Sequence, residues 1–122
     1  MKHLIILLTI MLGFAAAIDM PAGSEQFYVV QGLFGEMQIT QSACPIQDDF
    51  VNFACGTYPG TPQSFQQHLD AYIKVNLPGL RLNTDWFDNA GALVRDYVSA
   101  QGRYFFTYSP NGYIVVAFIP KQ

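Results

Sequence analysis

The chain has 122 residues, a net charge of −3 at pH 7 and a content of 51% hydrophobic and 15% aromatic residues. This length holds one domain, and the aromatic content predicts a globular rather than a disordered chain. Nucleic-acid-binding proteins cluster lysine and arginine, whereas the few basic residues here are dispersed, so we expect no nucleic-acid partner.

The first 17 residues have the pattern of a cleavable secretory signal. A short basic start precedes an apolar stretch over residues 4–14, and three alanines follow at positions 15–17. A membrane-spanning helix needs about 20 apolar residues, and the stretch over residues 4–14 is too short to be one. We expect no stable membrane insertion after the signal is removed. The alternative is an uncleaved N-terminal helix of the core. We predict a signal peptide over 1–17 and a single small domain over 18–122, secreted or periplasmic.

The start of that domain is predicted to form a β-hairpin. Residues 27–31 are rich in types that suit a pleated surface, and residues 36–40 alternate polar and apolar side chains. Residues 32–35 begin and end with glycine and suit a turn between the two strands.

Two cysteines, Cys44 and Cys55, follow this hairpin. In an exported protein an isolated pair most simply forms one disulfide, which here would fix a long loop over residues 42–62. A zinc site needs four ligands, and His68, the only histidine after the signal, cannot complete one. A redox pair normally has the Cys-x-x-Cys spacing, which is absent. We therefore predict a structural disulfide, and neither a metal site nor a cofactor.

The main helix is predicted over residues 62–76. Thr61 can cap its N-terminus, and Pro62 suits the first helical position, where no backbone N–H is needed. The residue before a proline avoids the helical region, so Pro78 ends the helix. Its apolar stripe consists of Phe65, Leu69, Tyr72 and Ile73.

Residues 84–100 fit two structures. As a helix, they align Trp86 with Leu93 and Tyr97 on one side, and two aspartates favour its N-terminus. As strands, they turn near Gly91. In a helix, a glycine at this interior position would reduce stability by up to about 1 kcal/mol relative to alanine. We predict strands.

The C-terminal hairpin has aromatic and β-branched strands over residues 103–108 and 113–119. We predict a type I turn with Pro110 and Asn111 at its centre, followed by Gly112 in the left-handed region. Both strands are apolar on both faces, and one helix covers only one face. The 42–62 loop, sheet curvature or another molecule must cover the rest. The candidate interaction face comprises Tyr104, Phe106, Tyr108, Tyr113 and Val115.

No catalytic constellation emerges from the sequence. Ser64 lies one turn before His68 on the main helix, but Asp70, two residues after His68, lies on another side of the helix, so the three side chains do not converge. The adjacent acids Asp48 and Asp49 are too few for a calcium site. Adjacent Arg95 and Asp96 point to opposite faces of a strand, and a surface position is expected for both.

The sequence therefore predicts an α+β fold, with an antiparallel sheet of four to six strands and one main helix packed on one face. We expect a non-catalytic exported interaction domain whose partner is a protein or a second copy. One alternative is a small secreted or periplasmic hydrolase that uses His68 with carboxylates. Another is a structural or assembly subunit of the cell envelope that adds strands at sheet edges.

Overall fold

The computed structural model describes residues 18–121, so the predicted signal peptide at 1–17 lies outside the described residues. Six antiparallel strands form one sheet in the order β1-β2-β6-β5-β4-β3. The elements are α2 (Glu25–Met37), β1 (Thr40–Gln41), β2 (Asn52–Thr57), α3 (Pro62–Asn76), β3 (Arg81–Asn89), β4 (Ala92–Val98), β5 (Gly102–Ser109), the short helix η1 (Pro110–Gly112) and β6 (Tyr113–Pro120). The predicted α+β class is confirmed.

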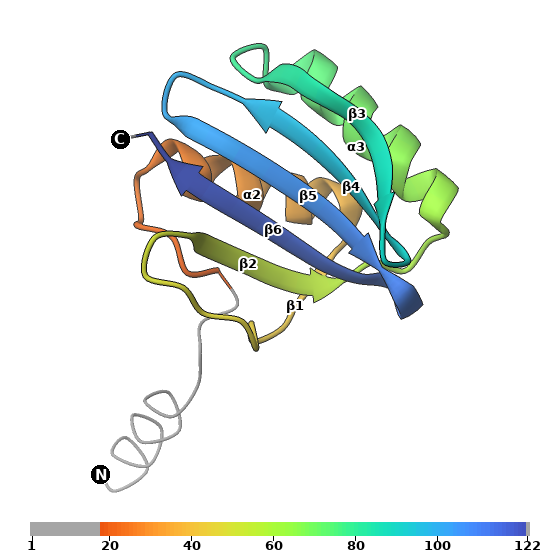
Figure 1. Cartoon of the computed structure of the whole chain (residues 1–122). Helices are drawn as coiled ribbons and strands as arrows, with labels where there is room; N and C mark the ends of the chain where they lie inside the picture. Colours follow the sequence, from red (N-terminus) through yellow and green to blue (C-terminus); the bar gives the residue numbers. More distant parts are fainter. Residues whose placement is uncertain (1–17, 122) are drawn as a thin grey trace, which may run out of the picture.

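Both helices lie on the same side of the sheet, which leaves the other side facing the viewer in Figure 1. The core lies between these two layers. From the sheet, Tyr104, Phe106 and Phe118 contribute its largest fully buried rings. No helix within residues 18–121 is long and apolar enough to cross a membrane.

The predicted first hairpin is wrong, because residues 25–37 form helix α2. Ser24 caps this helix by accepting a hydrogen bond from the backbone N–H of Phe27 at 3.2 Å. The buried side chains recur at helical spacing, and their packing on the sheet outweighs the strand preference of the two valines. These buried residues are Gln26, Val29, Val30, Leu33, Phe34 and Met37.

The main helix is confirmed as α3, with the predicted bounds. The Thr61 side chain accepts a hydrogen bond from the Ser64 backbone N–H at 3.1 Å, and Pro62 takes the first helical position. Three residues of the predicted stripe, Phe65, Leu69 and Ile73, are fully buried against the sheet. Tyr72 is only partly buried.

The strand interpretation of residues 84–100 is confirmed, since β3 and β4 form a hairpin. Ala90 and Gly91 connect the strands with φ angles of 56° and 89°. Such a two-residue turn in the left-handed region matches the twist of a hairpin.

The C-terminal hairpin of β5 and β6 is also confirmed, with a different turn. Gly112 has the predicted positive φ of 78°, but Asn111 has a φ of 68° instead of the right-handed value expected at the centre of a type I turn. Asparagine tolerates this region better than most residues with a Cβ.

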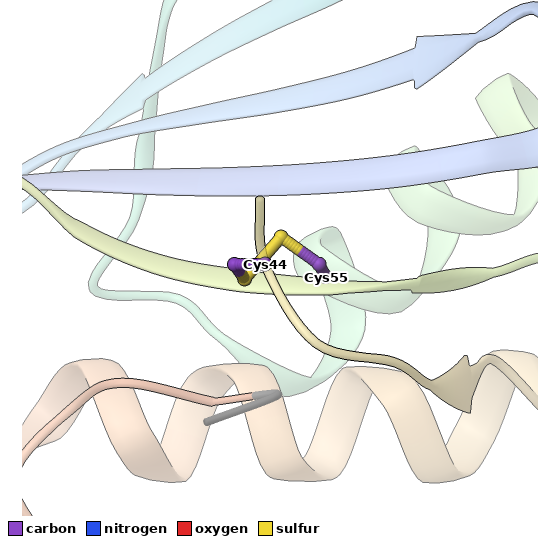
Figure 2. Close-up of a disulfide and its surroundings, with 2 residues drawn as sticks. All are labelled: Cys44 and Cys55. Carbon is purple, nitrogen blue, oxygen red and sulfur yellow. A yellow bond between two sulfur atoms is a disulfide. The ribbon is translucent and has the colours of Figure 1, made fainter. Parts of the chain in front are cut away.

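The stretch predicted as one long loop contains strand β2. This strand pairs with β6 along its whole length, from Asn52 opposite Phe118 to Thr57 opposite Tyr113. The predicted disulfide between Cys44 and Cys55 is confirmed, with a Cα–Cα distance of 5.3 Å (Figure 2). The segment before β2 is thereby fixed to the sheet.

Candidate functional site: the open face of the sheet

The strand register assigns each sheet residue to one of two faces. Ala54, Val116 and Phe106 form a cross-strand row that belongs to the buried core beneath the helices. Side chains alternate along a strand, so the next row points away from the helices. That row consists of Cys55, Val115, Thr107, Val94 and Phe87.

We call the side without helices the open face. It is almost entirely apolar or aromatic in the middle of the sheet, where most of its side chains are half-buried by their neighbours. Phe87 and Ile119, at 40% and 37% exposed, are its most accessible large apolar side chains. Its residues are Phe53, Cys55, Thr57, Arg81, Thr84, Phe87, Asn89, Ala92, Val94, Asp96, Val98, Arg103, Phe105, Thr107, Ser109, Tyr113, Val115, Ala117 and Ile119.

The candidate interaction residues divide between the two faces. Tyr104 and Phe106 are fully buried beneath the helices. Tyr108 lies on the same side, where its hydroxyl donates to the Gly60 carbonyl at 3.2 Å. Tyr113 and Val115 lie on the open face and are half-buried. The alternation of side chains along each strand was readable in the sequence, but the face that the helices cover was not.

One charged pair interrupts the open face. The Asp96 carboxylate accepts hydrogen bonds from Arg103 Nη2 at 2.7 Å and from Asn83 Nδ2 at 2.8 Å. Burial of Asp96, which is 1% exposed, opposes its ionisation, but these hydrogen bonds outweigh that effect and lower the pKa of the carboxyl. The Arg103 guanidinium also stacks on Phe105, with its Cζ 4.8 Å from the ring centroid.

Positive charge lies along one end of the open face, from β3 to the end of β6. Ile119, Arg103, Val98 and Arg81 form the row at the end of the sheet, and a shallow hollow of about 410 Å³ lies beside it. Lys121 lines the same hollow. Three of the five basic residues of 18–121 therefore line this hollow, and Arg103 is the one paired with Asp96.

Negative charge collects at the same end of the sheet, on the β2 side. A cavity of about 330 Å³ there is lined by Asp19, Asp48 and Asp49, together with Phe53 of the open face. The disulfide holds this segment in place, because Cys44 of the cavity wall is bonded to Cys55. Within residues 18–121, no group of three histidine, cysteine or acidic residues has an arrangement that could hold a metal ion.

The expectation that Arg95 and Asp96 lie at the surface is wrong, since they are 8% and 1% exposed. They do point to opposite faces. Arg95 lies beneath α3, where Nε and Nη2 donate to the two carboxylate oxygens of Asp70 at 3.0 and 2.8 Å. Trp86 and Tyr97 donate to the same carboxylate at 2.9 and 3.0 Å.

The Asp70 carboxylate is therefore fully engaged in holding α3 to the sheet. Burial is the main cause that raises the pKa of Tyr97 to about 12, with the charge of Asp70 next. Because one carboxylate accepts four hydrogen bonds, we assign this cluster a structural role. The sequence signal that could have revealed it is the single arginine within the apolar run of β4.

A second buried contact ties α2 to the sheet. The Glu25 carboxylate accepts hydrogen bonds from the hydroxyls of Tyr104 and Ser99, both at 2.7 Å. Burial and this carboxylate raise the pKa of Tyr104 above its ordinary range.

The side chains considered for hydrolysis do not converge. His68 Nε2 lies 3.4 Å from Glu36 Oε2, a contact across the outer surfaces of α3 and α2 in which both side chains are well exposed. Ser64 Oγ instead bonds to the Tyr58 hydroxyl and the Thr61 carbonyl. Asp70 is occupied by Arg95.

No protein-family model matches the chain, and neither the curated proteins nor the solved structures give a significant match.

Proposed function

We propose that this chain is a non-catalytic, exported interaction domain that docks a protein partner on the open face. The observation that carries the proposal is the contrast between the two sides of one sheet. Within residues 18–121, two helices cover one side and no helix lies over the other (Figure 1). That other side presents apolar rows. Sheets with one solvated face usually alternate apolar and polar residues, and these strands do not.

The chemistry of the open face supports protein docking. Phe53, Phe105 and Val115 offer apolar surface whose removal from water favours association by about 25 cal/mol per Å². Arginine and aromatic residues are enriched at the centres of protein interfaces. Arg103, stacked on Phe105 and paired with Asp96, provides both features in the middle of the end rows.

Export is the second part of the proposal. The signal pattern at residues 1–17 supports it, as does the Cys44–Cys55 disulfide, because disulfides persist in oxidising compartments. The backbone N–H of Asp19 donates to the Phe53 carbonyl at 2.8 Å, and processing after Ala17 would leave this contact in place.

Site-specific photo-crosslinking in the producing cells tests the docking face. A photoreactive phenylalanine analogue replaces Phe105 in one variant and Val75, which is 76% exposed on α3, in the control. We expect adducts of defined mass from position 105 and none from position 75. Absence of adducts at 105, or equal adducts at both positions, would contradict the proposal.

A further inference from the structure

We propose that the partner on the open face is a second copy of this chain, related by a two-fold axis parallel to the strands. This inference rests on the proposed function, because it names the occupant of the same face. Its evidence is the distribution of charge at the end of the sheet.

Two charged corners flank the apolar middle of the open face. Arg81 lies on β3 at one edge, and the basic row continues inward through Arg103 on β5, which is paired with Asp96, to Lys121 directly after β6. Asp19, Asp48 and Asp49 lie on the β2 side. Both corners are at the same end of the strands, because Phe53 pairs with Ala117 and Ile119 follows two residues later on β6. The sheet order places β6, β5 and β4 between the acidic corner and Arg81.

A two-fold interface brings one surface against itself. When the axis runs along the strands between β6 and β5, the left and right sides of the sheet exchange while each end stays in place. The acidic corner of one copy then faces Arg81 of the other, and this occurs twice. An axis perpendicular to the strands would instead exchange the two ends of the sheet. Each charged corner would then face the opposite end of the same side of the other copy, where, within residues 18–121, it meets no opposite charge cluster.

The same axis satisfies the packing of apolar sheets. Two sheets pack face to face with their strands nearly aligned, at about −30°. Rotation about an axis along the strands keeps the strands aligned, so Val115 and Phe105 of each copy meet the middle of the other. Complementary corners would fix the register and speed association.

Sedimentation of the disulfide-bonded protein, residues 18–122, tests the occupant. We expect a concentration-dependent dimer that weakens as salt is raised, because salt screens exposed charges. A monomer up to millimolar concentration would overturn this inference. Crosslinks from position 105 to a different protein would then still support the proposed function, so the two failures are distinguishable.

A charge swap tests the axis. Asp49→Lys and Arg81→Glu should each raise the dimer Kd about tenfold, because each change occurs at two symmetric contacts. The controls Glu36→Lys and Lys74→Glu make the same charge changes on the exposed helix side and should leave Kd unchanged. An equimolar mixture of the Asp49→Lys and Arg81→Glu chains should form a heterodimer with near wild-type Kd. Failure of the mixture to recover would overturn the proposed axis.

Discussion

The Asp70 carboxylate lies against the Arg95 guanidinium in a two-point pair, with Nε–Oδ1 and Nη2–Oδ2 distances of 3.0 and 2.8 Å. Asp70 belongs to α3 and Arg95 to β4, so this pair fixes the helix on the sheet. Arg95 also bonds to Asp85 of β3, and its Cζ lies 5.3 Å from the centre of the Trp86 ring.

Replacing Asp70 by alanine should therefore destabilise the fold strongly. The change leaves the guanidinium of Arg95 buried beneath α3 with only Asp85 as its charged partner. We expect the free energy of unfolding to fall by about 2–4 kcal/mol in chemical denaturation. Glu36→Ala, which removes the exposed contact with His68, is the matched control and should change stability by less than about 0.5 kcal/mol. Equal effects of the two changes would contradict the assigned role.

The free energy of unfolding should depend on pH through the Asp96 carboxyl. Its pKa is lowered in the folded state, so the ionised form stabilises the fold. This contribution is complete above the unfolded pKa of about 3.9 and is lost as the pH falls through the lower folded value. The stability difference between the wild type and Asp96→Asn should therefore shrink below about pH 4. A difference that stays constant or grows in acid would refute the assignment.

The disulfide should contribute to stability by restricting the unfolded chain. The cysteines are 11 residues apart, and closing a loop of about this length is worth roughly 3 kcal/mol. We expect the Cys44→Ser/Cys55→Ser double variant to lose stability of that order while its helix content, measured by circular dichroism, is retained. Addition of reductant should lower the stability of the wild type and leave the double variant unchanged.

The hydroxyl of Tyr104 should also be measurable. Tyr104→Phe removes a donor to the Glu25 carboxylate, and hydrogen bonds to charged groups are worth about 1.5–3 kcal/mol. We expect a loss within that range in urea denaturation. Tyr28→Phe alters a hydroxyl on a side chain that is 77% exposed and should be neutral, so a neutral Tyr104→Phe would show that the Glu25 contact contributes nothing.

Local signals in the sequence predicted most of the fold correctly. The cap Thr61 and the proline after it marked α3, and the Asn-Gly pair marked the β5–β6 hairpin. Helix α2 was missed because its neighbouring valines favour strands locally, whereas burial of one helical face against the sheet decides its structure. The cap Ser24 and the helical spacing of the apolar residues were present in this window, but the local strand preference of the valines was given more weight.

The open face could be predicted only in part. The excess of apolar residues in the C-terminal strands was visible, and it predicted that the face away from the helix needs another cover. Which residues would face outward depended on where α2 packs, and α2 was not predicted. For this reason the sequence did not reveal that Tyr104 and Phe106 lie beneath the helices and that Phe53 and Phe105 lie on the open face.

The central claim is that a second copy covers the open face. Accessibility to a soluble nitroxide, read by NMR on the methyl groups of neighbouring Val115 and Val116, tests it most directly, because the two valines lie on opposite faces of β6. Val116 should be protected at every protein concentration. Val115 should be accessible in dilute solution and become protected as the concentration rises. Accessibility of Val115 that does not change with concentration would contradict the claim.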